Sequence, residues 1–254
     1  MSTLGYILLF TFIGSIGALA GGLILLSQKK LVLKISHLLA SFAAGVLLGT
    51  AFFDLLPEAL HEGEEKGTNV LLWALIGIVV FFLFERFIHW FHHHEEYHEE
   101  KEQGSILPLI IAGDTMHNFL DGIVIAATFM ASAPLGIITA IAVFAHEVPQ
   151  EIGDFGLMLH KGLPRKKIIL VNVASAAVSF AGAIITYLLG SVVEAYIPIL
   201  LALTAGFFIY IAASDLIPEI HHETRHGFAF YESTLLIAGV VVIYILVNFL
   251  SEGH

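Results

Sequence analysis

The chain has 254 residues, of which 57% are hydrophobic and 13% are charged, whereas soluble domains average about half apolar and about a quarter charged residues. It contains no cysteine, which excludes disulfides and thiolate metal sites. Its formal net charge is −11 with only 11 basic residues, which argues against nucleic acid as a partner, because no basic face is available to neutralise phosphates. The composition therefore predicts an integral membrane protein.

The predicted elements are long apolar helices. About 20 apolar residues are needed for a helix to cross a bilayer. Segments of this kind occur at residues 4–26, 36–60, 69–91, 105–130, 135–159, 167–190, 195–220 and 234–251. We therefore expect an all-α integral membrane fold with eight transmembrane helices, which form a single transmembrane domain over residues 1–254.

The first span could be mistaken for a signal peptide, because the sequence Ala18-Leu19-Ala20 resembles a cleavage site. However, no basic residue precedes this apolar run, which continues to Leu26 before it meets Lys29 and Lys30. We therefore expect an uncleaved first span with its N-terminus outside.

The orientation follows from the basic residues, which are concentrated in cytosolic loops of membrane proteins. Ten of the eleven fall in alternate loops, and only Lys66 lies on the opposite side. This pattern predicts that both termini are extracytoplasmic, in a multi-pass protein of the cell membrane (an inner or plasma membrane). It also makes the loop after the third span cytosolic. That loop contains a His/Glu-rich tract at residues 92–104, which is either a loose metal-binding segment or a solvated linker without a specific role.

A nine-residue repeat links the second and seventh spans. Residues 54–62 match residues 215–223 at six of nine positions, with a constant offset of 161. Ala44-Gly45 and Ala205-Gly206 keep the same offset. Because the copies lie five spans apart, they point in opposite directions across the membrane. This predicts an inverted-topology repeat, a common feature of transporters, in which spans 1–3 and 6–8 flank a central pair in a 3+2+3 arrangement.

Two polar stripes interrupt the central pair of spans. On an α-helix, positions i, i+3, i+4 and i+7 share one face. In the fourth span this face carries Asp114, His117, Asn118 and Asp121. In the fifth span it carries Glu147, Gln150, Glu151 and Asp154, with His146 beside them.

The two stripes should face each other. The turn between the spans is short, so the helices pack antiparallel, and Asp121 and His146 lie nearly equal numbers of residues from Ala133. At 1.5 Å per residue the stripes stand roughly 18–26 Å from the turn. Interhelical hydrogen bonding would explain one or two polar residues. Several carboxylates and imidazoles at one depth are better explained by a bound cation, since intramembrane ionisable groups are costly.

The motifs resemble those of the ZIP (Zrt-, Irt-like) family of divalent metal transporters. The resemblance covers essentially the whole chain, and its specific parts are His117-Asn118-Phe119-Leu120-Asp121-Gly122 and residues 146–154, which read HEVPQEIGD. The second motif is similar to a branch whose pattern is HExPHExGD. Gln150 stands where that branch has its second histidine.

The resemblance implies a binuclear transport site. In it, His117 and His146 would hold one ion, with Gln150 between the sites, and Asn118, Asp121 and Glu147 would hold the second. Glu151 is an additional candidate that could offset the missing imidazole at position 150. The resemblance further implies zinc uptake into the cytosol by alternating access, with Zn²⁺ as the transported ion and no resident cofactor. Cd²⁺, Fe²⁺ and Mn²⁺ share these ligand types, so the selectivity is left open.

The two copies of the repeat would line opposite mouths of the pathway. The first copy would place Asp54, Glu58 and His61 at the external entrance, and the second would place Asp215, Glu219, His221 and His222 at the cytosolic exit. Helix capping and headgroup contacts are the alternative role for these residues.

Two other functions compete with transport by a carrier. His146-Glu147 could begin the HExxH motif of a membrane-embedded zinc hydrolase, although Gln150 occupies the second histidine position. The second competing function is that of a channel or a structural membrane protein with a buried polar network. The expected partners are divalent metal ions and the bilayer, and a homodimer is left open.

Overall fold

The computed structural model describes residues 2–93, 106–160, 162–221 and 228–251. The His/Glu-rich tract predicted at 92–104 lies outside the residues whose side chains are described, as do the side chains of Glu219, His221 and His222. Nothing in the structure therefore tests the roles predicted for these groups.

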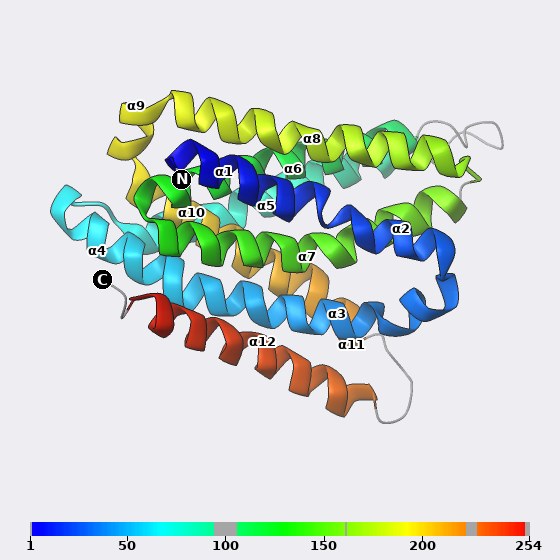
Figure 1. Ribbon diagram of the computed structural model, residues 1–254. Coiled ribbons are helices and arrows are strands. Elements are labelled where there is room, and N and C mark those ends of the chain that lie inside the picture. The colour runs from blue at the N-terminus through cyan, green and yellow to red at the C-terminus, as the bar shows by residue number, and fades with distance from the viewer. Residues whose placement is uncertain (1, 94–105, 161, 222–227, 252–254) are drawn as a thin grey trace.

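The described residues form helices and no strands, as the apolar segments predicted (Figure 1). The elements in chain order are α1 (Thr3–Thr11), η1 (Phe12–Ile16), α2 (Leu19–Ser27), α3 (Lys29–Thr50), η2 (Ala51–Leu55), α4 (Leu56–Lys66), α5 (Val70–His93), α6 (Ile106–Ala131), α7 (Ala133–His160), α8 (Arg165–Leu188), α9 (Gly190–Ala195), α10 (Ile197–Tyr210), η3 (Ile211–Leu216), α11 (Ile217–His221) and α12 (Phe228–Ser251). The elements labelled η are short π-helical segments that continue the helix before them.

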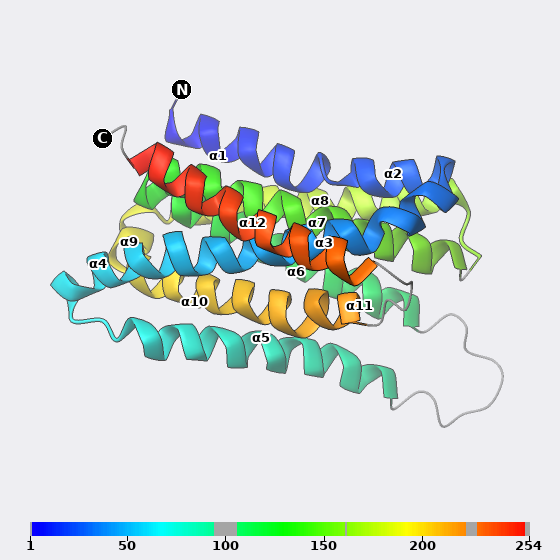
Figure 2. The same ribbon diagram turned by 90° about the horizontal axis from the view of Figure 1, so that it is seen from below.

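Six stretches of the described chain are long and apolar enough to cross a membrane: Thr3–Ser27, Ile35–Glu64, Ala133–Leu159, Arg165–Leu188, Ile197–Leu216 and Ala229–Leu250. Each overlaps a predicted span. The other two predicted spans correspond to α5 and α6, which are 24 and 26 residues long and run alongside the others (Figure 2). The described part of the chain is thus all-helical with six candidate spans, and spanning by α5 and α6 stays a prediction.

The sequence repeat is also a repeat of backbone structure. In η2 the N–H of Leu56 donates to the carbonyl of Ala51, and in η3 the N–H of Ile217 donates to the carbonyl of Ala212. These two i→i+5 bonds are offset by the same 161 residues as the sequence motif. Each immediately precedes a proline, Pro57 or Pro218, which has no N–H to give to the preceding turn. In each helix the widened turn thus lies where the proline interrupts the regular hydrogen bonds.

Glycines allow close crossings between helices on both sides of the bundle. A Cβ on Gly45 of α3 would lie 2.0 Å from the carbonyl oxygen of Leu236 in α12. A Cβ on Gly206 of α10 would likewise lie 2.2 Å from the carbonyl oxygen of Ala74 in α5. Backbones approach this closely only where one residue has no side chain, a packing mode typical of helices in membranes.

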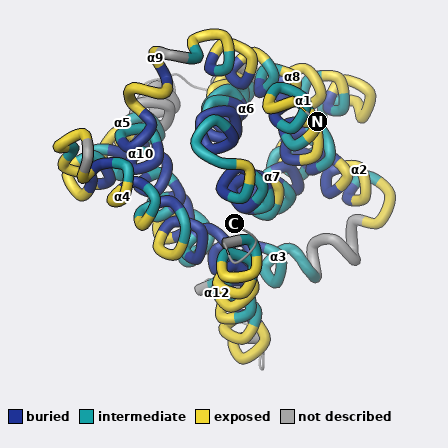
Figure 3. The backbone as a smooth tube through the Cα atoms, turned by 60° about the vertical axis from the view of Figure 1, so that its left-hand side comes forward, coloured by how far each residue is buried: buried dark blue, intermediate teal, exposed yellow. Residues whose placement is uncertain are grey.

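The pair α6–α7 lies in the middle of the bundle. α6 packs against α8, α1, α5 and α10, while α7 packs against α2, α3 and α12, and Figure 3 shows the two helices surrounded by the others. A single residue, Ser132, joins them, and its hydroxyl accepts a hydrogen bond from the N–H of Leu135 at 3.3 Å. This side chain caps the start of α7, and the tight connection keeps the two helices antiparallel.

Candidate metal centre

Four side chains from α6 and α7 converge inside the bundle. They are His117 and Asp121 from α6 and His146 and Glu147 from α7, and their ligand atoms all lie within 4.8 Å of one another. We call these four residues the central cluster. Each of them is at most 9% exposed. The facing stripes on the two helices therefore meet, as the antiparallel depth count predicted.

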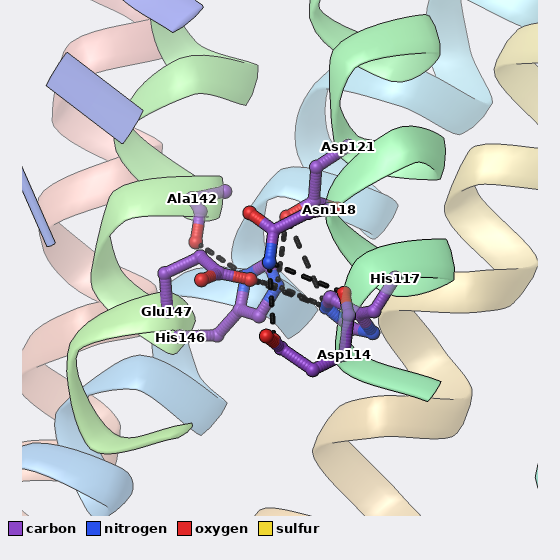
Figure 4. A network of polar contacts seen from close by, with 7 residues as sticks. All are labelled: Asp114, His117, Asn118, Asp121, Ala142, His146 and Glu147. Atoms are coloured by element: carbon purple, nitrogen blue, oxygen red, sulfur yellow. Dashed lines mark hydrogen bonds and ion pairs between the residues drawn. The ribbon is translucent and has the colours of Figure 1, made fainter. Parts of the chain in front are cut away.

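The distances within the central cluster suit one metal ion. The Nε2 atoms of His117 and His146 are 3.2 Å apart. Glu147 Oε1 lies 3.4 Å from His117 Nε2, and Asp121 Oδ2 lies 3.5 Å from His146 Nε2. A tetrahedral zinc ion with ligands at about 2.0–2.2 Å holds those ligands about 3.3–3.6 Å apart. The four side chains point toward a common centre (Figure 4), so an ion would fit with small side-chain shifts.

A hydrogen bond behind the cluster sets the tautomer of His146. Its Nδ1 lies 2.9 Å from the carbonyl oxygen of Ala142, one turn earlier in α7. A carbonyl oxygen only accepts, so Nδ1 carries the proton that it donates. In the neutral ring this leaves the lone pair on Nε2, the atom that faces the cluster. Metal-binding histidines are commonly oriented by this kind of contact.

The cluster also contains buried oxygen atoms that lack a donor. Asp121 Oδ2 and both carboxylate oxygens of Glu147 form no hydrogen bond with any described residue. Taking a carboxylate out of water costs several kcal/mol unless a positive charge or donors replace the lost hydration. A divalent cation at the centre would provide that compensation to both carboxylates.

Asn118 lies next to the cluster but turns its amide nitrogen away from it. Its Nδ2 donates to Asp114 twice, to Oδ1 at 3.1 Å and to the backbone carbonyl at 3.2 Å. Because both partners accept, the orientation of the amide is fixed. The amide oxygen of Asn118 forms no hydrogen bond with described residues and remains available as a ligand.

The remaining predicted ligands lie one turn further along α7. Glu151 is completely buried, and neither of its carboxylate oxygens has a hydrogen-bond partner among the described residues. Gln150 is only half-buried. Neither residue belongs to the central cluster. The structure thus gathers Asp121 and Glu147 with the two histidines, whereas the family resemblance implied that these carboxylates hold a separate ion.

Two cavities reach the central cluster from one side. The larger, of about 450 Å³, is lined by His146, Gln150, Gly153 and Asp215 among others. The smaller, of about 210 Å³, is lined by Asp114, His117, Gln150, Asp154 and Asp215 together with residues of α5. Gln150 and Asp215 border both cavities. We call this side of the α6–α7 pair the cavity end and the side near Ser132 the turn end.

Two aromatic rings support the imidazoles. Phe81 of α5 contacts the ring of His117 edge-on, with centroids 5.8 Å apart, and Phe208 of α10 contacts His146 in the same way at 6.0 Å. Neither ring stands out in the sequence, because phenylalanine occurs at 20 positions and nothing in the pattern separates these two. Asp114 belongs to the predicted polar stripe but is not among the predicted ligands.

The comparisons with known proteins agree with these features. A family described as "ZIP Zinc transporter" matches residues 2–108 and 92–247. "Zinc transporter ZIP4" of Rattus norvegicus is 31% identical over 269 residues, which covers 78% of this chain and 41% of that protein. "Zinc transporter ZIP13" of Pongo abelii is 31% identical over 220 residues, which covers 80% of this chain and 64% of that protein.

A shorter match is more similar. "Zinc transporter ZIP10" of Danio rerio is 42% identical over 126 residues, which covers 49% of this chain and 15% of that protein. The chain therefore spans between 15% and 64% of the lengths of these three curated relatives.

Proposed function

Because the chain belongs to the ZIP zinc transporter family, we propose that it carries divalent metal ions, Zn²⁺ foremost, across the cell membrane into the cytosol. The observation that carries this proposal is the central cluster, in which two imidazoles and two carboxylates surround one point inside a bundle of apolar helices. Imidazole and carboxylate together suit Zn²⁺, and the absence of thiolate favours release as well as binding. Cd²⁺, Fe²⁺ and Mn²⁺ are further candidates for transport.

We propose eight spans in a 3+2+3 arrangement, with α5 and α6 added to the six apolar stretches. The two π-helical turns at an offset of 161 residues support an inverted repeat. The close crossings support it as well: Gly45 corresponds to Gly206 at the same offset, and Gly77 of α5 corresponds to Gly239 of α12 at an offset of 162. The crossing of α3 with α12 thus has its counterpart in the crossing of α10 with α5.

We propose that the cavity end faces the cytosol, with both termini on the extracytoplasmic side. The basic loops support this orientation, because the loop between α7 and α8 carries Lys161, Arg165, Lys166 and Lys167. In that case the structure is a state open to the cytosol. At the turn end Val124, Ile125 and Val143 are at most 5% exposed and separate the central cluster from the other side. Alternating access would require this apolar packing to open.

The site is proposed to hold two ions. The central cluster would bind the first, and the second would bind one turn toward the cavity end, where the amide oxygen of Asn118 and the side chains of Gln150 and Glu151 offer further ligands. Asp54 of η2 and Asp215 of η3 would line the two mouths. Asp215 borders both cavities, which supports its assignment to the exit.

The hydrolase alternative gains no support. An HExxH site needs a second imidazole at position 150, but Gln150 stands there, and it borders both cavities. The relatives are named as zinc transporters, and a transporter is not an enzyme.

Zinc uptake into proteoliposomes tests the proposal. Wild-type protein should accumulate Zn²⁺, and Glu147→Ala or His117→Ala should reduce the rate roughly 100-fold, because each removes a ligand from a buried site. Glu232→Gln is the matched control, since Glu232 is also a buried carboxylate, 3% exposed, but lies on α12 outside the cluster. Absence of uptake by the wild type, or equal rates in all variants, would refute the transporter function.

A further inference from the structure

We propose that Phe81 is a positioning residue for the metal ligand His117, and that Tyr210 and Glu85 hold its ring in place. The inference rests on the proposed function, because it concerns how the central cluster keeps one of its imidazoles ready for an ion. It assigns a role to three residues of α5 and α10 that lie outside the predicted ligand set.

The two imidazoles of the central cluster are held in different ways. His146 donates from Nδ1 to the carbonyl oxygen of Ala142 at 2.9 Å, which fixes its ring from behind. The hydrogen bond and ion pairs that His117 forms with described residues all involve Nε2, the atom that faces the cluster. The contact that commonly orients a metal-binding histidine is therefore present for His146 but not among these contacts of His117. His117 also borders the smaller cavity, which gives its ring space to turn.

Packing against Phe81 takes the place of that hydrogen bond. The ring of Phe81 stands edge-on to the imidazole of His117, at an interplanar angle of 86° and with centroids 5.8 Å apart. Phe81 is itself 6% exposed. It contacts three further rings at centroid distances of 6.0, 5.3 and 5.6 Å, those of Phe84, Phe207 and Tyr210. A ring enclosed in this way has little room to move, so it restricts the orientations open to His117.

A hydrogen bond between two helices completes the enclosure of Phe81. The hydroxyl of Tyr210 donates to Oε2 of Glu85, since an ionised carboxylate only accepts. Glu85 follows Phe81 by four residues on α5, so the two side chains share one face of the helix. The bond therefore keeps the ring of Tyr210 over the face of α5 that carries Phe81.

The other half of the sequence repeat packs without these groups. At the offsets of 161 and 162 residues, the positions of Tyr210, Phe81 and Glu85 correspond to Gly49, Ile243 and Val247. A Cβ on Gly49 would lie 3.0 Å from the Cβ of Ile243, so α3 and α12 are in close contact there. The crossing of two helices in this fold thus requires neither a tyrosine nor a carboxylate at these positions. In the half that contacts His117, these residues serve a purpose beyond helix packing.

The zinc affinity of the full-length protein in detergent tests the proposal, measured by competition with a chelating dye. The background carries His92→Ala, His93→Ala, His94→Ala and His98→Ala, because the His/Glu-rich tract could bind zinc by itself. Phe81→Leu should weaken zinc binding about tenfold, a typical loss when a metal ligand is deprived of its support. Phe82→Leu is the matched control, because Phe82 is the next residue on α5, is 47% exposed and contacts Tyr210 instead of His117. It should bind zinc as tightly as the background.

Phe208→Leu makes the same change beside the other histidine. Phe208 contacts His146 edge-on at 6.0 Å, but the carbonyl oxygen of Ala142 still orients that imidazole in the variant. We therefore expect zinc affinity to fall by at most about twofold.

Variants of Tyr210 and Glu85 separate positioning from charge. Tyr210→Phe and Glu85→Ala should each weaken zinc binding about threefold, as expected for the loss of one hydrogen bond. The double variant should lose no more than either single variant, because both remove the same bond. Glu85→Gln removes the charge but keeps an acceptor for the phenol, and it should bind zinc as the background does.

The visible spectrum of Co²⁺ bound in place of Zn²⁺ gives a readout that a purely structural role would not change, since at saturation it reports ligand geometry. The bands should shift in Phe81→Leu and stay unchanged in Phe82→Leu. If Phe81→Leu does not fold, Tyr210→Phe provides the same test with a single hydroxyl removed. Unchanged affinity or unchanged bands would overturn the inference, as would equal losses in Phe81→Leu and Phe208→Leu, or in Glu85→Gln and Glu85→Ala. Proteoliposome uptake decides the transport function separately, because an absence of uptake would leave these differences in binding unaffected.

Discussion

The two ends of the α6–α7 pair are built from the same two helices but in opposite ways. At the turn end Val124, Ile125 and Val143 are buried in a continuous apolar core. At the cavity end Asp114, Gln150 and Asp154 border an open space. The central cluster lies where the two environments meet. The two cavities therefore reach the polar groups at this depth from the cavity end, and on the other side Val124, Ile125 and Val143 pack against the central cluster.

The difference shows how a membrane protein can place charge inside a bundle. Around Val124, Ile125 and Val143, the turn end is stabilised by close apolar contacts. The cavity end has fewer such contacts, and its carboxylates border cavities that water and ions can enter. Substitutions should therefore have opposite consequences at the two ends.

The largest effect should come from a charge at the turn end. Val143 has no exposed surface, so Val143→Asp would bury a carboxylate without a partner and should destabilise the fold by about 3 kcal/mol or more. Gly153→Asp is the control, because Gly153 borders the larger cavity. Folded yield and thermal unfolding in detergent measure both variants. Similar losses for the two would show that the ends do not differ in access to water.

Adding a methyl group to a closely packed glycine should lower the free energy of unfolding by less than a buried charge does. A Cβ on Gly122 would lie 1.9 Å from the carbonyl oxygen of Ser179, whereas a Cβ on Gly153 would meet nothing within 4 Å. We expect Gly122→Ala to cost about 1–3 kcal/mol because α6 and α8 must separate. Gly153→Ala should be neutral or stabilising by up to about 1 kcal/mol from helix propensity. Thermal unfolding midpoints measure the difference, and a stable Gly122→Ala protein would contradict the close packing.

Single introduced cysteines should report how accessible each end is to a thiol reagent. The wild-type chain has no cysteine, so no native cysteine has to be removed first. Gly153→Cys should react with a membrane-impermeant thiol reagent applied to the cytosolic side. Ala126→Cys should react at least tenfold more slowly, because Ala126 has no exposed surface and buried thiols are inert. Faster labelling of Gly153→Cys from the outside would reverse the proposed orientation.

The smallest effect concerns Gln150, which borders both cavities. Gln150→His would offer an imidazole in place of an amide oxygen, and Zn²⁺ binds imidazole more readily. We expect zinc affinity to rise by up to about tenfold, or about 1.4 kcal/mol, with uptake slowed by tighter binding. Equal affinity in the two proteins would place position 150 outside the metal path.

Much of this arrangement could be predicted from the sequence. The helical spacing of the stripes and the short connection at Ser132 were enough to place Asp121 opposite His146, and their side chains lie 3.5 Å apart. Pro57 and Pro218 are visible in the sequence as residues that cannot donate a helical hydrogen bond, and both follow a π-helical turn. These features depend on local geometry, which residue spacing largely determines.

Other features depend on contacts that the spacing does not encode. The supporting rings of Phe81 and Phe208 come from helices whose rotation about their own axes is set by packing. The division into a cavity end and a turn end likewise depends on how α3, α5 and α10 approach the central pair. The choice of which carboxylate joins which histidine also needed the structure, because Asp121 and Glu147 lie within reach of both imidazoles.

We expect a metal ion to bind between α6 and α7 within the central cluster. An anomalous difference map from crystals grown with Zn²⁺, recorded on both sides of the zinc absorption edge, would locate it. We expect a peak about 2.0–2.2 Å from the Nε2 atoms of His117 and His146 and from carboxylate oxygens of Asp121 and Glu147. Zinc peaks elsewhere in the protein, with none between these four side chains, would contradict this expectation.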